Sequence, residues 1–380
     1  MPVARIRSAA PALLLLIACN GDDGGSTGLS AGSSASAFTG ASASASASAS
    51  ASESAGESEG SGTEGDGVPA CEGARLLPLP EDPAARGPWA VGAKTVVVAD
   101  RRTEIWYPAR PGSEADLPTV SYDLRLQLPP AEQGKIPDEA NPFQPCACYR
   151  DLPLDDAHGP YPVIVFIHGT AGFRTQSLTF MTHWASRGFV VVASDHDGIT
   201  LADVLGGTID ADQAGDARRV LDALALAEGE FAFLGGHLDL PRIGMSGHSA
   251  GGMAIQGLGD RAQVLIPMAA GGVSSGAALR STLVLAAQSD QVVGYSDTKA
   301  GFESSPAPRR FVGIADTGHL AFSSLCSLKN GMGQDFLQIA DAAGVCGAQF
   351  ASALFDCDPE YTADEISWSI SQYASSAALE

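Results

Sequence analysis

The stretch Ser246-Gly247-His248-Ser249-Ala250-Gly251-Gly252 decides the fold that this sequence predicts. It follows a short strand at residues 242–245 and continues into a segment with helical periodicity at residues 250–258. A Gly-x-Ser-x-Gly pattern between a strand and a helix is typical of a tight turn that exposes the serine hydroxyl at the edge of a sheet. Ser249 is therefore a candidate nucleophile, and the alternative is an incidental glycine-rich turn.

Unbroken apolar runs on both sides of this turn alternate with helical stretches, a pattern typical of strands buried on both faces. We expect strands at residues 163–167, 189–193, 242–245, 262–268, 282–287 and 310–314. Helices are expected at residues 177–186, 210–227, 250–258 and 297–303. Residues 95–99 and 104–107 predict an antiparallel hairpin before them. The expected fold class is α/β, namely a doubly wound, mostly parallel sheet with an N-terminal hairpin, in one domain at 71–380.

Residues 108–160 are rich in proline and too long for a plain connection between two elements. They predict either a wall or lid over a functional site or a purely structural insertion.

The charge balance excludes one class of function. The chain has 22 basic and 44 acidic residues and a formal net charge of −22. Nucleic-acid binding needs a basic surface that neutralises phosphates, so no nucleic-acid partner is expected.

The N-terminal sequence is typical of an export signal. Two arginines precede an apolar run at residues 9–18, which is too short to cross a bilayer of about 30 Å. Leu16-Ile17-Ala18-Cys19 resembles a bacterial lipobox, which implies lipidation of Cys19 after removal of residues 1–19. The alternative is an ordinary secretory signal. Residues 20–70 are Gly-, Ser- and Ala-rich and predict a flexible tether, so we expect an exported protein anchored by lipid to a bacterial membrane, on its periplasmic or cell-surface face.

The remaining cysteines favour disulfides over metal ligation in an exported protein. They are Cys71, Cys146, Cys148, Cys326, Cys346 and Cys357. The sequence does not select among the fifteen pairings that six cysteines allow, although Cys346 and Cys357 are close enough to close a short loop. No metal and no cofactor is expected.

A serine nucleophile needs a histidine base, and on this fold the chain order is serine, acid, histidine. Of the seven histidines, only His319 follows Ser249. Asp290 comes just after the strand expected at residues 282–287 and is the preferred acid. Asp297 and Asp316 remain alternatives.

The oxyanion hole should combine the backbone N–H of Ala250 with one from the loop after the first central strand. In Ile167-His168-Gly169-Thr170-Ala171-Gly172, the N–H of Thr170 is the candidate. His168 is interpreted as bracing this loop. Asp195-His196-Asp197 is interpreted as a turn, with a metal cluster as the alternative.

Several motifs between Pro88 and Cys326 resemble bacterial relatives of platelet-activating factor acetylhydrolase, often described as dienelactone hydrolases, within the α/β-hydrolase superfamily. They are Pro88-Trp89-Ala90-Val91-Gly92, the segment at residues 166–175, Gly247-His248-Ser249-Ala250-Gly251-Gly252 and the segment at residues 318–326. The resemblance implies hydrolysis of short acyl esters by Ser249 and His319, with Thr170 and Ala250 as oxyanion donors.

The chain departs from that family at the acid. Family members carry the acid after the strand that follows the turn containing the serine, where this chain has Ile266-Pro267-Met268-Ala269-Ala270-Gly271 and no carboxylate. Asp290 instead has the position found in cutinase-like polyester hydrolases, which argues against phospholipid specificity.

The leading hypothesis is a serine carboxylesterase that acts on short-chain or polymeric esters. A lactone hydrolase or a phospholipid acetylhydrolase is the alternative among enzymes. A non-catalytic surface binding protein on a hydrolase scaffold is the alternative from another class, because fold does not fix function.

Overall fold

The computed structural model describes residues 76–351 and 357–380. The expectations for the signal peptide at 1–19, the lipidation of Cys19 and the tether at 20–70 lie outside these residues. Within the described ranges, no helix is both long and apolar enough to cross a membrane.

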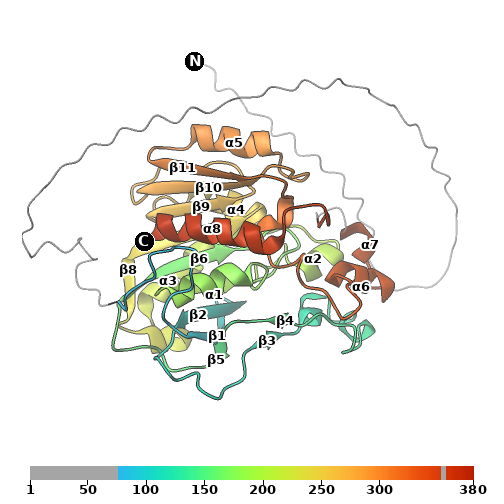
Figure 1. Cartoon of the computed structure of the whole chain (residues 1–380), viewed down its shortest axis with the longest axis horizontal. Coiled ribbons are helices and arrows are strands. Elements are labelled where there is room, and N and C mark those ends of the chain that lie inside the picture. Colours follow the sequence, from blue (N-terminus) through green and yellow to red (C-terminus); the bar gives the residue numbers. More distant parts are fainter. Residues whose placement is uncertain (1–75, 352–356) are drawn as a thin grey trace, which may run out of the picture. The chain divides into compact units, whose positions relative to one another are not determined.

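A nine-stranded sheet forms the centre of the described part of the chain, with the order β11-β10-β9-β8-β6-β7-β2-β1-β5 (Figure 1). The strands are β1 Val91–Val98, β2 Arg101–Pro108, β5 Tyr149–Arg150, β6 Tyr161–Ile167, β7 Val190–Ser194, β8 Leu238–His248, β9 Val264–Met268, β10 Ser281–Ala287 and β11 Arg309–Ile314. The pairings from β7 through β11 are parallel, while β1 and β2 form an antiparallel hairpin that joins β7 through β2. The prediction of a mostly parallel sheet with an N-terminal hairpin is confirmed.

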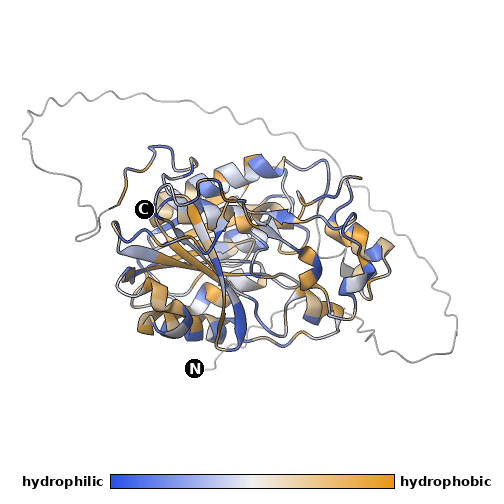
Figure 2. Cartoon of the chain, turned by 90° about the horizontal axis from the view of Figure 1, so that it is seen from below, coloured by the Kyte–Doolittle hydropathy of each residue, from blue (hydrophilic) through white to orange (hydrophobic). Residues whose placement is uncertain are grey.

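Helices cover both faces of this sheet. They are α1 Leu178–Ser186, α2 Leu201–Leu205, α3 Gln213–Leu226, α4 Ala250–Ala254, α5 Tyr295–Ser304, α6 Phe336–Ala342, α7 Ala348–Ala351 and α8 Asp364–Leu379. Apolar side chains of α1 and α8 pack on one face, and those of α3 pack on the other. Figure 2 shows hydrophobic residues gathered along the central strands. Burying apolar strands on both sides in this way stabilises a parallel sheet.

Several elements differ from the sequence expectation, among them α2, α6 and α7, where no helix was expected. Strand β8 begins at Leu238, ahead of Pro241, whereas the expected strand began at residue 242. Its pairing with β6 shifts register between Pro162 and Val163, and this irregularity accommodates a proline that cannot donate a ladder hydrogen bond. Helix α8 was not expected, because its buried face consists of the serines Ser367, Ser371, Ser375 and Ser376 rather than of large apolar residues.

The insertion at 108–160 contains short elements only. They are β3 Ser121–Tyr122, paired with β4 Gln144–Pro145, and the 3₁₀ turns η1 Leu124–Gln127 and η2 Gln133–Lys135. Leu124, Leu128 and Ile136 pack into an apolar cluster with Phe336 and Leu337 of α6. This packing gives the insertion a core of its own beside the sheet.

Disulfides link Cys146 to Cys148 and Cys326 to Cys357. Cys346 is also disulfide-bonded. The prediction of disulfides is confirmed for these residues, and the link between Cys346 and Cys357 that their short separation allowed is not formed. The fold brings the segment before α8 back beside the loop that follows β11, so that Cys326 is the nearer partner in space although it is farther in sequence.

Candidate active site

Ser249 lies in a strained turn between β8 and α4. Its backbone has φ 55° and ψ −120°, a conformation that non-glycine residues rarely adopt. The surrounding glycines make the turn possible, because a Cβ on Gly251 would lie 2.1 Å from the carbonyl oxygen of Ile167, and one on Gly247 would lie 2.4 Å from the backbone of Gly251. Strain of this kind is common at functional sites. It holds Ser249 beyond the carboxyl end of β8.

Asp290 and His319 meet from two neighbouring loops. Asp290 follows β10, and His319 opens the 3₁₀ turn η5 His319–Phe322 after β11. The Nδ1 atom of His319 lies 2.9 Å from Oδ2 of Asp290. The other carboxylate oxygen, Oδ1, accepts hydrogen bonds of 2.8 Å from the backbone N–H groups of Val292 and Val293. Both side chains are buried, so the carboxylate is held firmly against the imidazole.

The alternative acids lie elsewhere. Asp297 is in the first turn of α5. Asp316 adopts a left-handed conformation, with φ 52°, and its carbonyl oxygen accepts a hydrogen bond of 2.7 Å from the N–H of Thr362. Of the three aspartates that the sequence left open, Asp290 is the one whose carboxylate contacts His319.

Ser249 and His319 line the same small cavity of about 60 Å³, together with Thr170, Leu320 and Leu325. Among the described residues no hydrogen bond joins Oγ of Ser249 to the imidazole. Hydrogen bonds between a nucleophile and its base are often long without substrate and shorten in the reacting complex.

The two candidate oxyanion donors flank this cavity. Ala250 is the first residue of α4, and Thr170 lies on the loop after β6. Within the described ranges, neither backbone N–H has a hydrogen-bond partner, whereas the next one along, that of Ala171, donates to the carbonyl of Ile199 at 3.0 Å. A Cβ on Gly169 would lie 3.0 Å from Cβ of Ser249, so the loop packs directly on the serine. The arrangement suits a pair of donors aimed at a developing oxyanion.

Gln176 connects the three loops of the site, and sequence reasoning missed it. The backbone N–H of Gly169 donates to Oε1 of Gln176 at 3.3 Å, and Nε2 of Gln176 lies 2.8 Å from Nδ1 of His248. Nε2 of His248 lies in turn 2.8 Å from the carbonyl oxygen of His319. Because an amide nitrogen only donates and a carbonyl oxygen only accepts, His248 must carry its proton on Nε2. The hydrogen bonds then form one directed chain from the oxyanion loop to His319.

The charge state of His248 suits this chain. Burial, and next the neighbouring His319, lower the pKa of His248 from 6.5 to about 3. Burial, and next His196, likewise lower the pKa of His168 to about 4. Both imidazoles are therefore neutral near pH 7, and His168 braces the oxyanion loop by accepting the backbone N–H of His196 at 3.0 Å.

The Asp195-His196-Asp197 segment has protein partners in the structure. Asp195 pairs with Arg174 at 2.6 Å, and His196 contacts Asp216 at 3.0 Å. No group of three or more candidate ligands that could hold a metal ion occurs in the described part of the chain. The contacts explain this segment as turn and ion-pair structure.

The strand order, the strained turn after β8 and the positions of Asp290 and His319 define an α/β-hydrolase fold. Residues 150–265 match the chlorophyllase family, a segment that contains the Thr170 loop and Ser249 but ends before Asp290 and His319. No curated protein sequence matches the chain. A solved structure similar to it is a ferulic acid esterase from Streptomyces cinnamoneus, with 19% identity, a TM-score of 0.47, and coverage of 73% of this chain and 91% of that one.

Proposed function

We propose that this protein is a serine ester hydrolase. The observation that carries the proposal is the buried contact between Asp290 and His319 beside Ser249, in a cavity flanked by two backbone N–H groups that have no hydrogen-bond partner among the described residues. Such a set supplies a nucleophile, a base with its orienting acid, and oxyanion donors. The match of residues 150–265 to the chlorophyllase family supports an activity on esters.

The proposed reaction has two steps. Oγ of Ser249 attacks the ester carbonyl carbon while His319 takes the hydroxyl proton, and the N–H groups of Thr170 and Ala250 stabilise the oxyanion. The alcohol leaves with the proton from His319, which yields an acyl-enzyme. A water molecule, deprotonated by His319, then attacks the acyl carbon, and the bond to Oγ of Ser249 breaks as His319 returns the proton to that oxygen and the acid leaves. Asp290 remains ionised and keeps the imidazole oriented.

The cavity favours short acyl groups. Its volume is about 60 Å³, and the buried side chains of Leu320 and Leu325 line it together with the exposed Val292. An acetyl or propionyl group fits such a space better than a long chain. A short-chain or polymeric ester is therefore the proposed substrate, with lactones and acetylated phospholipids as the competing ones.

Labelling with a fluorophosphonate tests the nucleophile. We expect covalent labelling at Ser249, loss of labelling in Ser249→Ala, and full labelling in Ser246→Ala, a control on strand β8 whose hydroxyl donates to the carbonyl of Ile266. A folded protein that stays unlabelled would contradict the proposal and favour a binding protein. Hydrolysis of nitrophenyl esters of increasing acyl length, compared with ring opening of lactones, then separates the enzyme classes.

We further propose that the chain is exported and anchored through a lipid on Cys19. Support comes from the lipobox-like end of the apolar run at residues 9–18. Fractionation of cells expressing the full chain tests this proposal. The wild type should sediment with membranes and Cys19→Ser should not, and equal distribution of the two would contradict it.

A further inference from the structure

A second cavity lies between α1, α8 and the segment that follows η5. Its volume is about 410 Å³, within the range of roughly 300–1,000 Å³ that small-molecule sites occupy. Leu178, Leu328 and Trp368 form its apolar wall. It shares no lining residue with the cavity beside Ser249, so it is a separate space.

Two buried hydroxyls on this cavity lack partners. Ser324 is 4% exposed, and its Oγ atom has no hydrogen-bond partner within the described residues. Oγ1 of Thr179, in the first turn of α1, is also buried and has no hydrogen-bond partner among the described residues. Buried polar atoms are nearly always hydrogen-bonded in folded proteins. Both residues line the cavity, but these two oxygen atoms have almost no accessible surface, so the residues present other atoms to it and Arg86 is the polar group that a ligand can reach.

Arg86 brings a positive charge to the same cavity. Its guanidinium donates to Oγ1 of Thr182 at 3.5 Å and to the carbonyl of Ala147 at 3.3 Å, both long for hydrogen bonds. No carboxylate within the described ranges forms an ion pair with it. The residue as a whole reaches solvent, yet neighbouring atoms desolvate the guanidinium enough to lower its pKa. An anion bound at this point would give the guanidinium of Arg86 a partner of opposite charge.

We propose that this cavity is a second ligand site, which takes a carboxylate joined to an apolar or aromatic body. The carboxylate binds the guanidinium of Arg86, and the body packs on Trp368 and Leu178. The inference does not depend on the reaction proposed for Ser249.

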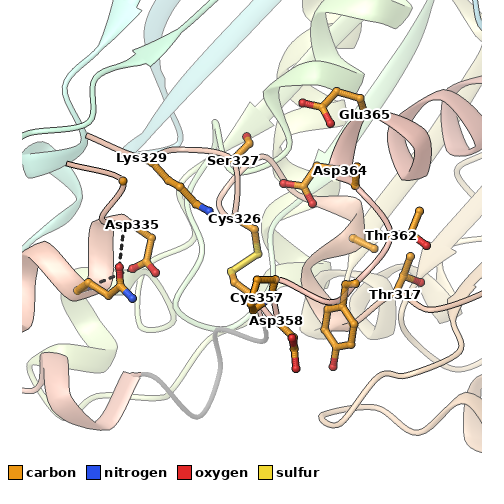
Figure 3. Close-up of a pocket in the computed structure, with 17 residues that line it drawn as sticks. Thr317, Cys326, Ser327, Lys329, Asp335, Cys357, Asp358, Thr362, Asp364 and Glu365 are labelled. Atoms are coloured by element: carbon orange, nitrogen blue, oxygen red, sulfur yellow. Dashed lines mark hydrogen bonds between the residues drawn. A yellow bond between two sulfur atoms is a disulfide. The ribbon is translucent and has the colours of Figure 1, made fainter. Parts of the chain in front are cut away.

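The other titratable groups at this cavity are compatible with an anion. His183 is neutral near pH 7, because burial, and next Arg187, lower its pKa to about 4. Glu365 is exposed at the rim, which this cavity shares with a neighbouring one of about 450 Å³. Figure 3 shows that neighbouring cavity, around the Cys326–Cys357 disulfide, with the carboxylates of Asp358 and Asp364 beside it. Its walls carry four carboxylates and one ammonium group, whereas the cavity at Arg86 has Glu365 as its one carboxylate, so a bound carboxylate is repelled more strongly in the neighbouring space.

Benzoate and hexanoate are suitable probes. Binding is measured by calorimetry and by quenching of Trp368, whose ring borders the cavity while the other three tryptophans are buried in the core. We expect both acids to bind and benzamide, the neutral analogue of benzoate, to bind weakly. Arg86→Met should lower benzoate affinity by roughly tenfold or more, the loss expected when a charge-assisted hydrogen bond is removed.

The matched control is Arg280→Met. Arg280 is another exposed arginine without an ion pair among the described residues, and it does not line this cavity, so the substitution should leave benzoate affinity unchanged. The measurement is repeated on protein whose Ser249 has been blocked by a fluorophosphonate, where benzoate should still bind. Failure of both acids to bind, an equal loss of affinity in Arg280→Met, or loss of binding after the block would each overturn the proposal.

Discussion

Replacing Gln176 with leucine should break the hydrogen-bond chain that joins the oxyanion loop to His319. Leucine fills most of the buried space but leaves the N–H of Gly169 and Nδ1 of His248 without their partners at 3.3 and 2.8 Å. Each buried group left unpaired costs about 1–3 kcal/mol of stability. A domain with about 5–15 kcal/mol of folding free energy tolerates this change.

The effect on catalysis should exceed the effect on stability. An oxyanion donor contributes roughly 10²–10³-fold to kcat, and Gln176→Leu loosens the Thr170 loop without removing its N–H. We therefore expect kcat to fall by roughly ten- to a hundredfold, or about 1.4–2.7 kcal/mol in activation free energy, with KM changed little. The assay is hydrolysis of nitrophenyl acetate, alongside urea unfolding of the same preparation.

Two further variants make this test specific. Gln263→Leu removes a glutamine whose Oε1 accepts the backbone N–H of Ile243 at 2.7 Å, remote from the site, so it should lose stability and keep wild-type kcat. Gln176→Glu keeps an acceptor for Gly169 but faces Nδ1 of His248 with a second acceptor, so it should not restore activity. A folded Gln176→Leu protein with wild-type kcat would refute the role of the chain.

Three other changes give independent tests. Asp290→Asn should lower kcat by about 10⁴-fold because His319 loses its orienting acid, while Asp316→Asn should keep a kcat near that of the wild type. Equal losses of kcat in the two variants, measured in the ester assay, would contradict the assignment of Asp290 as the acid. Leu325→Ala should enlarge the acyl cavity and raise kcat/KM for butyrate esters relative to acetate esters by roughly fourfold per methylene. The measurement is hydrolysis of nitrophenyl esters of increasing acyl length. An unchanged preference between the two esters would place the acyl group elsewhere. Burial lowers the pKa of His183 from 6.5 to about 4, so in the unfolded chain it binds a proton at higher pH than in the folded one. The contribution of neutral His183 to the free energy of unfolding is present above about pH 6.5 and is lost as the pH falls toward 4. The loss is about 2 kcal/mol between pH 7 and pH 5. Urea midpoints of His183→Gln should therefore decline less over that interval than those of the wild type.

Much of the architecture was predictable because it depends on local patterns. Strands buried on both faces read as unbroken apolar runs, and this signal located β6, β7, β9, β10 and β11 to within a few residues. Helix α8 escaped prediction because its fully buried positions are the serines Ser367, Ser371, Ser375 and Ser376. Hydrophobic periodicity does not register such a helix.

The disulfides illustrate the same limit. Cysteine count and export predicted bonding, but short separation in sequence suggested Cys346 with Cys357, and the fold pairs Cys326 with Cys357. Disulfide pairing depends on the distance between Cα atoms, here 5.4 Å, which sequence separation does not determine.

For the candidate site, the sequence by itself selected Ser249 as the candidate nucleophile, from the turn pattern, and His319 as the candidate base, from the order of residues along the chain. It left three aspartates open as the acid, and only the tertiary structure placed the carboxylate of Asp290 against His319. Gln176 and the cavity at Arg86 had no sequence signal at all. Their significance lies in contacts between segments far apart in the chain, and such contacts exist only after the sheet has brought the ends of its strands together.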